Sequence, residues 1–428
     1  MKWVYIAILV LAPFRSFSQE INLEYVTKHA IDLNAVATGN EDYGGFEKLD
    51  SLLAGIEIVM LGEQTHHDGT TFDTKIKLIK YLHDSLGFDV LAFESSMYES
   101  EKAWEQITSG GDVRLNLGKS INTFWSPLVE FKELADYVES TLDSENPLEI
   151  RGFDNQLGGG FAGGILMEEI KDYLQRKVPN LVNEELLTLL DESFVKKLWY
   201  AEVRKFKKKD AKAIVQHLEE VLAALNKIDK DDESEYWIRH LNNLSKFISD
   251  FKLGTEYRDQ EMAKNLIWIK EKNPDKKIIC WGATSHFLYN ATAIELVKPN
   301  KWIEQHYSDT RMMGDFIKEK YQERVFTIGF TAYEGEYGTV GYGRKGEVEA
   351  APINSLEFLL SQSEYENYLL PLGSNTRSNL ISRPLGYRYI KTDISQMMDA
   401  VIFNRTMQRP RLDLEFFREI YPEHKYIK

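Results

Sequence analysis

The sequence predicts an α/β fold with a mostly parallel central sheet flanked by helices, and with a helical insertion subdomain. Short apolar, β-branched runs alternate with segments of helical periodicity in the first part of the chain. A long stretch, about residues 165–270, is then almost entirely helical in period, and apolar runs resume after it. Strands that alternate with helices at this spacing are typical of βαβ units, which form parallel sheets.

The first elements follow this alternation closely. Residues 56–63, IEIVMLGE, form a continuous apolar run that is typical of a buried strand. Residues 74–88 carry apolar side chains at helical spacing and end near a glycine, as a helix does. Residues 89–95 and 148–155 predict two further strands, and residues 128–141 predict the helix between them.

The middle of the chain changes character after the segment GGGFAGG, which we interpret as a flexible turn because no Lys-Ser or Lys-Thr pair follows its glycines. Helical periods then cover residues 165–178, 183–206, 210–228 and 234–251, and strands resume at 276–286, 324–335 and 399–406. We expect one α/β domain over residues 19–428, with the helical subdomain at about 165–270 packed beside the sheet.

Composition limits the kinds of partner. The chain of 428 residues is 43% hydrophobic and 28% charged, which is ordinary for a folded protein. Its formal net charge of −15 argues against binding to nucleic acid or to an anionic membrane surface. Cys280 is the one cysteine, so no internal disulfide can form, and its apolar surroundings predict a small buried hydrophobe.

The first 18 residues resemble a secretory signal peptide. Lys2 precedes an apolar stretch of about a dozen residues, Trp3 to Phe14, which is too short to span a bilayer comfortably. Ser16 and Ser18 then supply the small residues of a cleavage site before Gln19. We expect an exported protein, periplasmic or secreted, without stable membrane insertion; the alternative is an uncleaved membrane anchor.

Ionisable residues lie at or just after the ends of four of the predicted strands. The first strand ends in Glu63 and His66, the second in Glu94, the third in Asp154 and a later one in His286. Ligands bind outside the carboxyl ends of strands in open parallel sheets, so these side chains are expected to meet at one rim. A carboxylate three residues before an imidazole can orient it and favour its charged form, which suits a general base near neutral pH.

Other interpretations apply to single residues. A lone acidic residue after a strand is often the N-cap of the next helix, which Asp154 and Glu94 could be. His67 and Asp68 are expected to be loop residues exposed to solvent. The sequence contains no G-x-S-x-G, H-E-x-x-H or Walker-type motif. Any chemistry therefore uses water directly, activated by a histidine or by a metal.

An ordered set of motifs resembles the erythromycin esterase family. LGEQTH, followed by a helix carrying Lys75, and GFDVLAFES resemble the opening motif. The resemblance continues through NPLEIRGFDNQ and YRDQEMAKNLIWIKEKNPDKKIICWGATSHF, and ends with SRPLGYRY and MMDAVIFNRT. It covers about residues 45–428, with the helical middle matching only in character.

The resemblance implies a hydrolase that opens a macrolide lactone by attack of water, and hence a role in antibiotic resistance. His66 would be the general base and Glu63 its partner, while Lys75 falls where the family often has an arginine near the developing oxyanion. Glu94 and His286 match the family's glutamate and later histidine.

Asp154 and Arg258 lie in the matching motifs, and we assign them to substrate binding. A small-molecule ester is the expected partner, and no cofactor or metal is expected.

Two departures leave the substrate open. Many members have glycine where this chain has His67, and Lys75 is a point charge without the planar fork of arginine. Besides an ester hydrolase, we consider a metal-dependent hydrolase with His66, Glu63, Glu94 and His286 as ligands. The third hypothesis is a non-catalytic binding protein for a hydrophobic small molecule, with the helical region as its lid.

Overall fold

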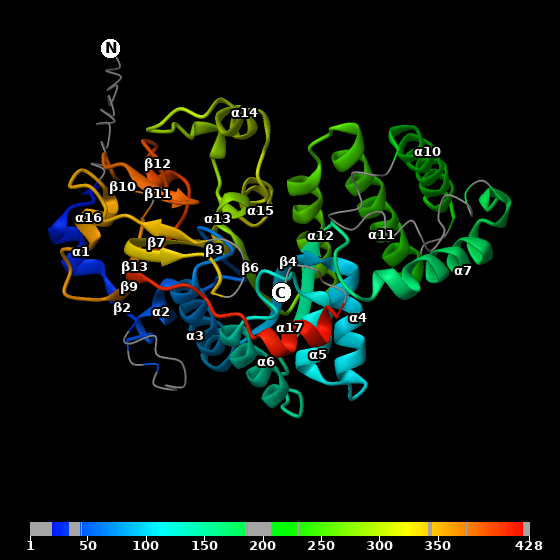
Figure 1. Cartoon of the computed structure of the whole chain (residues 1–428), viewed down its shortest axis with the longest axis horizontal. Helices are drawn as coiled ribbons and strands as arrows, with labels where there is room; N and C mark the ends of the chain where they lie inside the picture. Colours follow the sequence, from blue (N-terminus) through cyan, green and yellow to red (C-terminus); the bar gives the residue numbers. More distant parts are fainter. Residues whose placement is uncertain are drawn as a thin grey trace, which may run out of the picture.

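The protein, represented by a computed structural model, is built around one large twisted sheet. The structure describes residues 19–33, 43, 45–184, 186, 207–228, 231–340, 345–373 and 375–422. Within these residues a nine-stranded sheet has the order β2-β9-β13-β7-β3-β6-β4-β5, with β8 paired to β7 (Figure 1). All neighbours from β13 to β5 are parallel, whereas β9, β2 and β8 pair antiparallel.

The strands of this sheet are β2 (Ile31–Asp32), β3 (Ile58–Glu63), β4 (Phe88–Ser96), β5 (Glu149–Asp154), β6 (Lys277–Ala283), β7 (Val325–Tyr337), β8 (Gly346–Val348), β9 (Asn367–Pro371) and β13 (Ala400–Met407). Two small sheets pair β1 (Gln19–Glu20) with β10 (Thr376–Arg377), and β11 (Ser382–Leu385) with β12 (Arg388–Ile390). The predicted fold class, a mostly parallel sheet flanked by helices, is confirmed.

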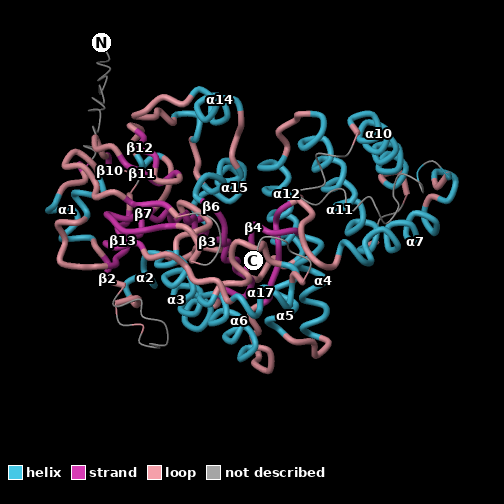
Figure 2. Tube along the Cα trace, viewed as in Figure 1, coloured by secondary structure: helices cyan, strands magenta, loops and turns pink. Residues whose placement is uncertain are grey.

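Helices cover both faces of the parallel strands (Figure 2). One face packs against α2 (Lys48–Leu52), α3 (Gly69–Leu86), α5 (Val113–Ser120) and α6 (Val129–Thr141). The other packs against α12 (Arg258–Lys272), α13 (Thr284–Phe287) and α15 (Met313–Tyr321). Outside these two layers and the helical subdomain lie α1 (Leu23–His29), α4 (Met97–Thr108), α14 (Lys301–Asp309), α16 (Leu356–Leu360) and α17 (Leu414–Ile420).

Alternation along β3 explains why its sequence is continuously apolar. Val59 and Leu61 point into the core under α3, while Ile58 and Met60 point into the core under α12. A strand buried on both faces needs apolar side chains at every position. Cys280, on the neighbouring β6, is fully buried in the same α12 core, so the prediction of a buried hydrophobe is confirmed.

The helical subdomain lies at one end of the molecule, away from β9 and β13 (Figure 1). It contains α7 (Met167–Lys177), α10 (Lys208–Leu225) and α11 (Asp232–Ile248), which share an apolar core with Tyr98 of α4. Short 3-10 and π-helical turns complete the chain: η1 (Ala162–Leu166), η2 (Pro179–Leu181), η4 (Ser249–Leu253), η5 (Ala291–Ala293), η6 (Gln322–Arg324) and η7 (Ile394–Gln396).

One expectation needs correction, and two strands of the sheet were not predicted. The segment GGGFAGG is not a flexible turn: the backbone N–H groups of Gly159, Phe161 and Ala162 all donate to the buried carboxylate of Glu99, at 2.7–3.1 Å. The antiparallel edge strands β9 and β2 went unpredicted, because strands so short leave little periodicity to read.

Parts of the predictions lie outside the described residues. These are the signal peptide at residues 1–18 and nearly all of the helix expected at 183–206. No helix in the described ranges combines the length and apolar character that crossing a bilayer requires.

Candidate active site

The carboxyl ends of four parallel strands bring the predicted residues together. In the β3–β6 register Glu63 lies opposite Ala283, and in the β4–β5 register Ser96 lies opposite Asp154. Gly282 permits a close approach here, because a Cβ at this position would lie 2.9 Å from Oε2 of Glu94. Charged side chains from β3, β4 and β5 therefore share one rim with the short helix α13.

Glu63 is the centre of a buried cluster. Its side chain is 0% exposed, and its Oε1 accepts hydrogen bonds from Trp125 Nε1 at 2.8 Å and from His66 Nδ1 at 3.0 Å. Its Oε2 contacts the ammonium of Lys75. A buried carboxylate is tolerated only when it is paired and hydrogen-bonded, and both of these oxygens are.

His66 combines a fixed ring with an open nitrogen. Its ring stacks on Phe124 at 5.0 Å and meets Trp125 edge-on at 5.1 Å, and its side chain is 28% exposed. The contact with Glu63 assigns the Nδ1 proton, so Nε2 carries the lone pair in the neutral ring. Within the described residues no hydrogen-bond partner occupies Nε2, which leaves it able to accept a proton.

The charges around His66 favour its protonated form. Burial by itself lowers the pKa of His66, but the hydrogen bond to Glu63 and the charges of Glu94 and Glu63 outweigh it and raise the pKa above the usual value. A histidine that gains basicity from a neighbouring carboxylate is suited to take a proton from water.

Lys75 lies behind Glu63 rather than at an open surface. Its side chain is completely buried, and its Nζ contacts Glu63, the carbonyl of Gly282 at 3.2 Å and the face of Trp281 at 4.8 Å. Burial lowers the pKa of Lys75, although the charge of Glu63 opposes this effect. The contacts assign Lys75 to Glu63, and they differ from the expected position beside a substrate oxyanion.

Arg258 joins two of the predicted carboxylates. Its Nη2 lies 2.7 Å from Asp154 Oδ2 and 2.8 Å from Glu94 Oε1, and its Nε lies 3.3 Å from Asp154 Oδ1. Asp154 is thus an ion-pair partner of Arg258, not a helix N-cap. Burial by itself raises the pKa of Glu94, but the charges of His286, Arg258 and His66 hold it well below the usual value.

His286 lies between two carboxylates. Its Nδ1 is 2.8 Å from Asp259 Oδ1, and its Nε2 is 3.3 Å from Glu94 Oε1 and 3.1 Å from Arg258 Nη1. Burial lowers the pKa of His286, but the charges of Asp259 and Glu94 outweigh it and raise the pKa to about 10. His286 therefore carries a proton at neutral pH, and its Nε2–H faces Glu94.

His67 and Asp68 are not the exposed loop residues that the sequence predicts. Asp68 is fully buried, and its carboxylate accepts hydrogen bonds from Thr65 N and Oγ1 and from Tyr387 Oη at 2.9–3.0 Å. His67 is half-buried, with Nδ1 3.1 Å from Thr339 Oγ1. These contacts tie the loop after β3 to the C-terminal part of the chain.

Two of the residues proposed as metal ligands, Glu63 and Glu94, are bonded to other side chains of the protein. Glu63 contacts Lys75 and Trp125, and Glu94 contacts Arg258. Among the described side chains, no group of three or more His, Cys, Asp or Glu residues is arranged to hold a metal ion. In this arrangement the carboxylates of Glu63 and Glu94 are each paired with a cationic side chain.

Three functional neighbours were missed by the sequence reasoning. Trp125 and Phe124 hold Glu63 and His66 from a loop that carries no recognisable motif. Asp259 follows Arg258 directly in the sequence YRDQ, so this motif was a signal that could have found it. Its Oδ1 also accepts a hydrogen bond from Met313 N at 3.0 Å, which fixes the carboxylate for His286.

Fold and site together define an α/β protein with a histidine–carboxylate centre at the carboxyl edge of a parallel sheet. The chain belongs to the erythromycin esterase family, whose model, described as erythromycin esterase, matches residues 83–407. It is a hydrolase of this family. Glu94, Asp154, Arg258 and His286 lie within the matched residues, whereas Glu63, His66 and Lys75 precede them.

Similar proteins agree with this membership. "Putative hydrolase YbfO" of Bacillus subtilis (strain 168) is 27% identical over 395 residues, covering 83% of this chain and 84% of that protein. A solved structure of a succinoglycan biosynthesis protein has a TM-score of 0.69 at 20% identity, covering 91% of this chain and 97% of its own. The erythromycin esterase mutant EreC in its open conformation has a TM-score of 0.63 at 16% identity, covering 89% and 98%. At these identities the solved structures support the fold alone.

Proposed function

We propose that the protein is an exported carboxylic-ester hydrolase that opens a macrolide lactone or a similar ester with a water molecule activated by His66. One observation carries the proposal: His66 Nδ1 is held by Glu63 at 3.0 Å, while Nε2 has no partner within the described residues and lies in a partly exposed ring. This is the arrangement that a general base requires.

The chemistry needs no covalent intermediate. His66 Nε2 takes a proton from water as the water oxygen attacks the ester carbonyl carbon, forming a tetrahedral oxyanion. The oxyanion collapses, the carbon–oxygen bond of the alcohol breaks, and the departing alkoxide receives a proton from the His66 imidazolium. Glu63 stabilises that imidazolium, and a positioned base of this kind contributes typically about 10²–10⁴-fold.

Arg258 and His286 are the groups best placed to stabilise the oxyanion. Both are cationic, both are partly exposed, and both lie at the same rim as Glu94. Charge fixed in advance where negative charge develops is among the largest contributions to catalysis. We assign Lys75 the different role of a positioning residue, which neutralises Glu63 and holds its carboxylate toward His66.

Erythromycin is the first substrate to test, because family membership points to a macrolide. Mass spectrometry of erythromycin incubated with the wild type is expected to show a gain of about 18 Da, the mass of the water that the base activates. His66→Ala is expected to show no gain while retaining its fold by circular dichroism. Full turnover by His66→Ala would overturn the assignment of the base.

Export is the second component of the proposal. It rests on the composition of residues 1–18, where a positive residue and a short apolar stretch precede Ser16 and Ser18. N-terminal sequencing of the protein from fractionated cells tests it. A mature chain beginning at Gln19 outside the cytoplasm is expected, and an intact N-terminus in the membrane fraction would favour the anchor instead.

A further inference from the structure

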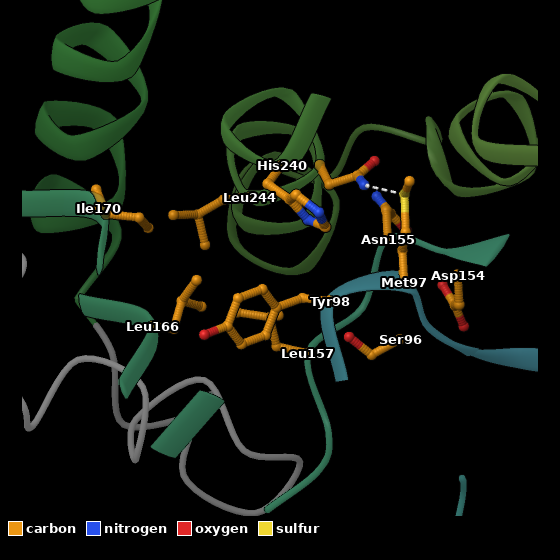
Figure 3. A pocket seen from close by; sticks show the side chains of 11 residues that line it. Ser96, Met97, Tyr98, Asp154, Asn155, Leu157, Leu166, Ile170, His240 and Leu244 are labelled. Carbon is orange, nitrogen blue, oxygen red and sulfur yellow. Dashed lines mark hydrogen bonds between the residues drawn. The ribbon is translucent and has the colours of Figure 1, made fainter. Parts of the chain in front are cut away.

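Two regions adjoin the catalytic rim. Toward the end of β5, a small cavity beside Asn155 has room for about one water molecule, so it accepts no larger group (Figure 3). Beside β7, the hairpin formed by β11 and β12 contacts the loop that carries His66 (Figure 1). We call residues 64–68 the base loop. The proposed chemistry uses neither the hairpin nor any residue of the base loop other than His66.

The hairpin is bonded to the base loop on both sides of His66. Two residues before it, the carbonyl of Gln64 accepts a hydrogen bond from Gly386 N at 3.1 Å. Two residues after it, Oδ1 of the fully buried Asp68 accepts a hydrogen bond from the Tyr387 hydroxyl at 2.9 Å. The base loop is therefore tied to the tip of the hairpin at both of its ends.

Within the base loop, the carboxylate of Asp68 fixes the backbone around His66. Its Oδ2 accepts a hydrogen bond from Thr65 N at 2.9 Å and its Oδ1 accepts one from Thr65 Oγ1 at 3.0 Å. Thr65 Oγ1 in turn accepts a hydrogen bond from His67 N at 3.1 Å. An aspartate directly before a helix ordinarily caps it, but the side chain of Asp68 makes no capping hydrogen bond to α3. The carboxylate therefore holds the loop instead of the helix.

Tyr387 has a backbone conformation that a tyrosine rarely adopts. It forms the two-residue turn of the hairpin together with Gly386, and its φ is 60°. Both central residues of such a turn need a positive φ, which glycine and asparagine adopt far more easily than a bulky residue does. The Tyr387 ring stacks on Tyr337 at 5.0 Å, and its hydroxyl reaches Asp68. Strained positions of this kind persist where the surrounding contacts fix them, and they cluster at functional sites.

We propose that Tyr387 and Asp68 are positioning residues for the general base, a role that rests on the proposed ester hydrolysis and deepens it. The Tyr387 hydroxyl holds the Asp68 carboxylate, which in turn holds the backbone of Thr65. The loop fixed in this way keeps His66 Nδ1 on Glu63. Without these contacts His66 turns away from Glu63, and the tautomer with its proton on Nε2 becomes populated. That tautomer has no lone pair on Nε2 with which to take a proton from water.

The tautomer of His66 tests this role without any turnover. NMR of the ring nitrogens, with histidine isotopically labelled in the full chain, distinguishes a proton on Nδ1 from one on Nε2. His66→Gln assigns the signal by its loss, and spectra are recorded on the alkaline side of the His66 titration, where the ring is neutral. We expect mainly Nδ1–H in the wild type. In Tyr387→Phe the ratio of Nδ1–H to Nε2–H should fall by about fivefold or more, the value of roughly one hydrogen bond.

A control variant and a double variant assign this change to the contact between Tyr387 and Asp68. Tyr387→Phe removes only the hydroxyl and keeps the ring. Tyr389→Phe is the matched control, because Tyr389 lies on β12 of the same hairpin and its hydroxyl has no hydrogen bond to the base loop. It should keep the tautomer ratio of the wild type. Asp68→Ala removes the acceptor, so adding Tyr387→Phe to it should cause no further change.

Turnover is a second readout where erythromycin is hydrolysed. Tyr387→Phe should lower kcat by about fivefold and leave KM within about twofold, because the contact acts on the base and not on substrate binding. If Asp68→Ala does not fold, the comparison of Tyr387→Phe with Tyr389→Phe decides alone.

Several outcomes would overturn the positioning role. These are a wild-type ring with its proton mainly on Nε2, an unchanged tautomer ratio in Tyr387→Phe, an equal change in Tyr389→Phe, or a double variant that is clearly more altered than Asp68→Ala. Failed hydrolysis of erythromycin together with the expected tautomer ratios would overturn the ester chemistry and leave the positioning of His66 in place.

Discussion

Lys75 and Glu63 form an ion pair in which both side chains are completely excluded from solvent. The two oxygens of Glu63 have different partners: Oε2 contacts Lys75, whereas Oε1 accepts hydrogen bonds from His66 and Trp125. Without Lys75 the negative charge of the Glu63 carboxylate would remain buried, and no ammonium group would balance it. The pair therefore links the stability of the fold to the position of the proposed base.

Lys75→Met should destabilise the protein by about 3–5 kcal/mol, because removing one partner of a buried ion pair leaves the other unpaired. Urea unfolding followed by circular dichroism measures the loss. Adding Glu63→Gln to this variant should recover part of it, since a neutral amide no longer needs the ammonium.

Lys80→Met is the control for a pair at the surface. Lys80 lies 2.6 Å from Glu133, and both side chains are partly exposed, so the loss should be within about 1 kcal/mol. Equal losses in the two lysine variants would show that the Lys75 pair has no special weight.

The pH dependence of turnover should report the raised pKa of His66. The base acts in its neutral form, so kcat/KM should rise with pH through the pKa of His66, which lies above the usual 6.5 or so. Glu63→Gln removes the hydrogen-bonding charge that raises this pKa, so the acid limb of the profile should move to lower pH and the maximum should fall.

Glu133→Gln, which changes a partly exposed carboxylate on α6 that pairs with Lys80 and does not contribute to the pKa shift of His66, should leave the acid limb in place. An acid limb that stays unchanged in Glu63→Gln would separate Glu63 from the titration of the base.

Much of the sheet could be predicted because its strands are buried on both faces. The apolar runs at 56–63, 148–155 and 276–286 correspond to β3, β5 and β6, which lie at the centre and far edge of the parallel region. The antiparallel strands β9 and β2 could not, because they are short and their pairing depends on β13 rather than on local pattern.

Some residues of the candidate site could also be predicted from the sequence, and others could not. Residues at the carboxyl ends of strands, such as Glu63, Glu94 and Asp154, were found because the ends of parallel strands share an edge. Trp125 was not, because its contact with Glu63 joins positions 62 residues apart and no periodicity predicts it. The burial of Lys75 and Asp68 likewise depends on tertiary packing over the loop after β3.

Asp259→Asn should lower the pKa of His286 from about 10, because the charge of Asp259 is the largest contribution that raises it. The folded-state pKa exceeds the unfolded value of about 6.5, so His286 adds stability below that pH and loses it as the pH rises through 10. Thermal unfolding across this range should be less pH-dependent in the variant, and the basic limb of kcat/KM should move to lower pH.

Asp136→Asn provides a surface control, since Asp136 pairs only with the exposed Lys132 among its described neighbours. It should retain the pH dependence of the wild type. If Asp259→Asn did so as well, the proton on His286 would not depend on Asp259.

Gly159 packs directly against the buried side chain of Glu99, and its backbone N–H donates a hydrogen bond to that carboxylate. A Cβ there would lie 2.4 Å from Cδ of Glu99, the carboxylate that accepts three backbone N–H groups of this loop. Burial raises the pKa of Glu99 to about 7 and the three N–H groups oppose this, so losing them would leave a poorly satisfied acid in the interior. Gly159→Ala should lower the free energy of unfolding by roughly 2–3 kcal/mol and expose the loop to protease.

Gly158→Ala is the matched control, because a Cβ at Gly158 meets nothing within 4 Å, and it should be neutral or stabilise by up to about 1 kcal/mol. Urea unfolding and limited proteolysis of the two variants test this prediction. Equal stability and equal protease resistance of the two variants would mean that the loop does not depend on its hydrogen bonds to Glu99. Destabilisation of Gly159→Ala alone would mean that Glu99 fixes the loop between the sheet and the helical subdomain.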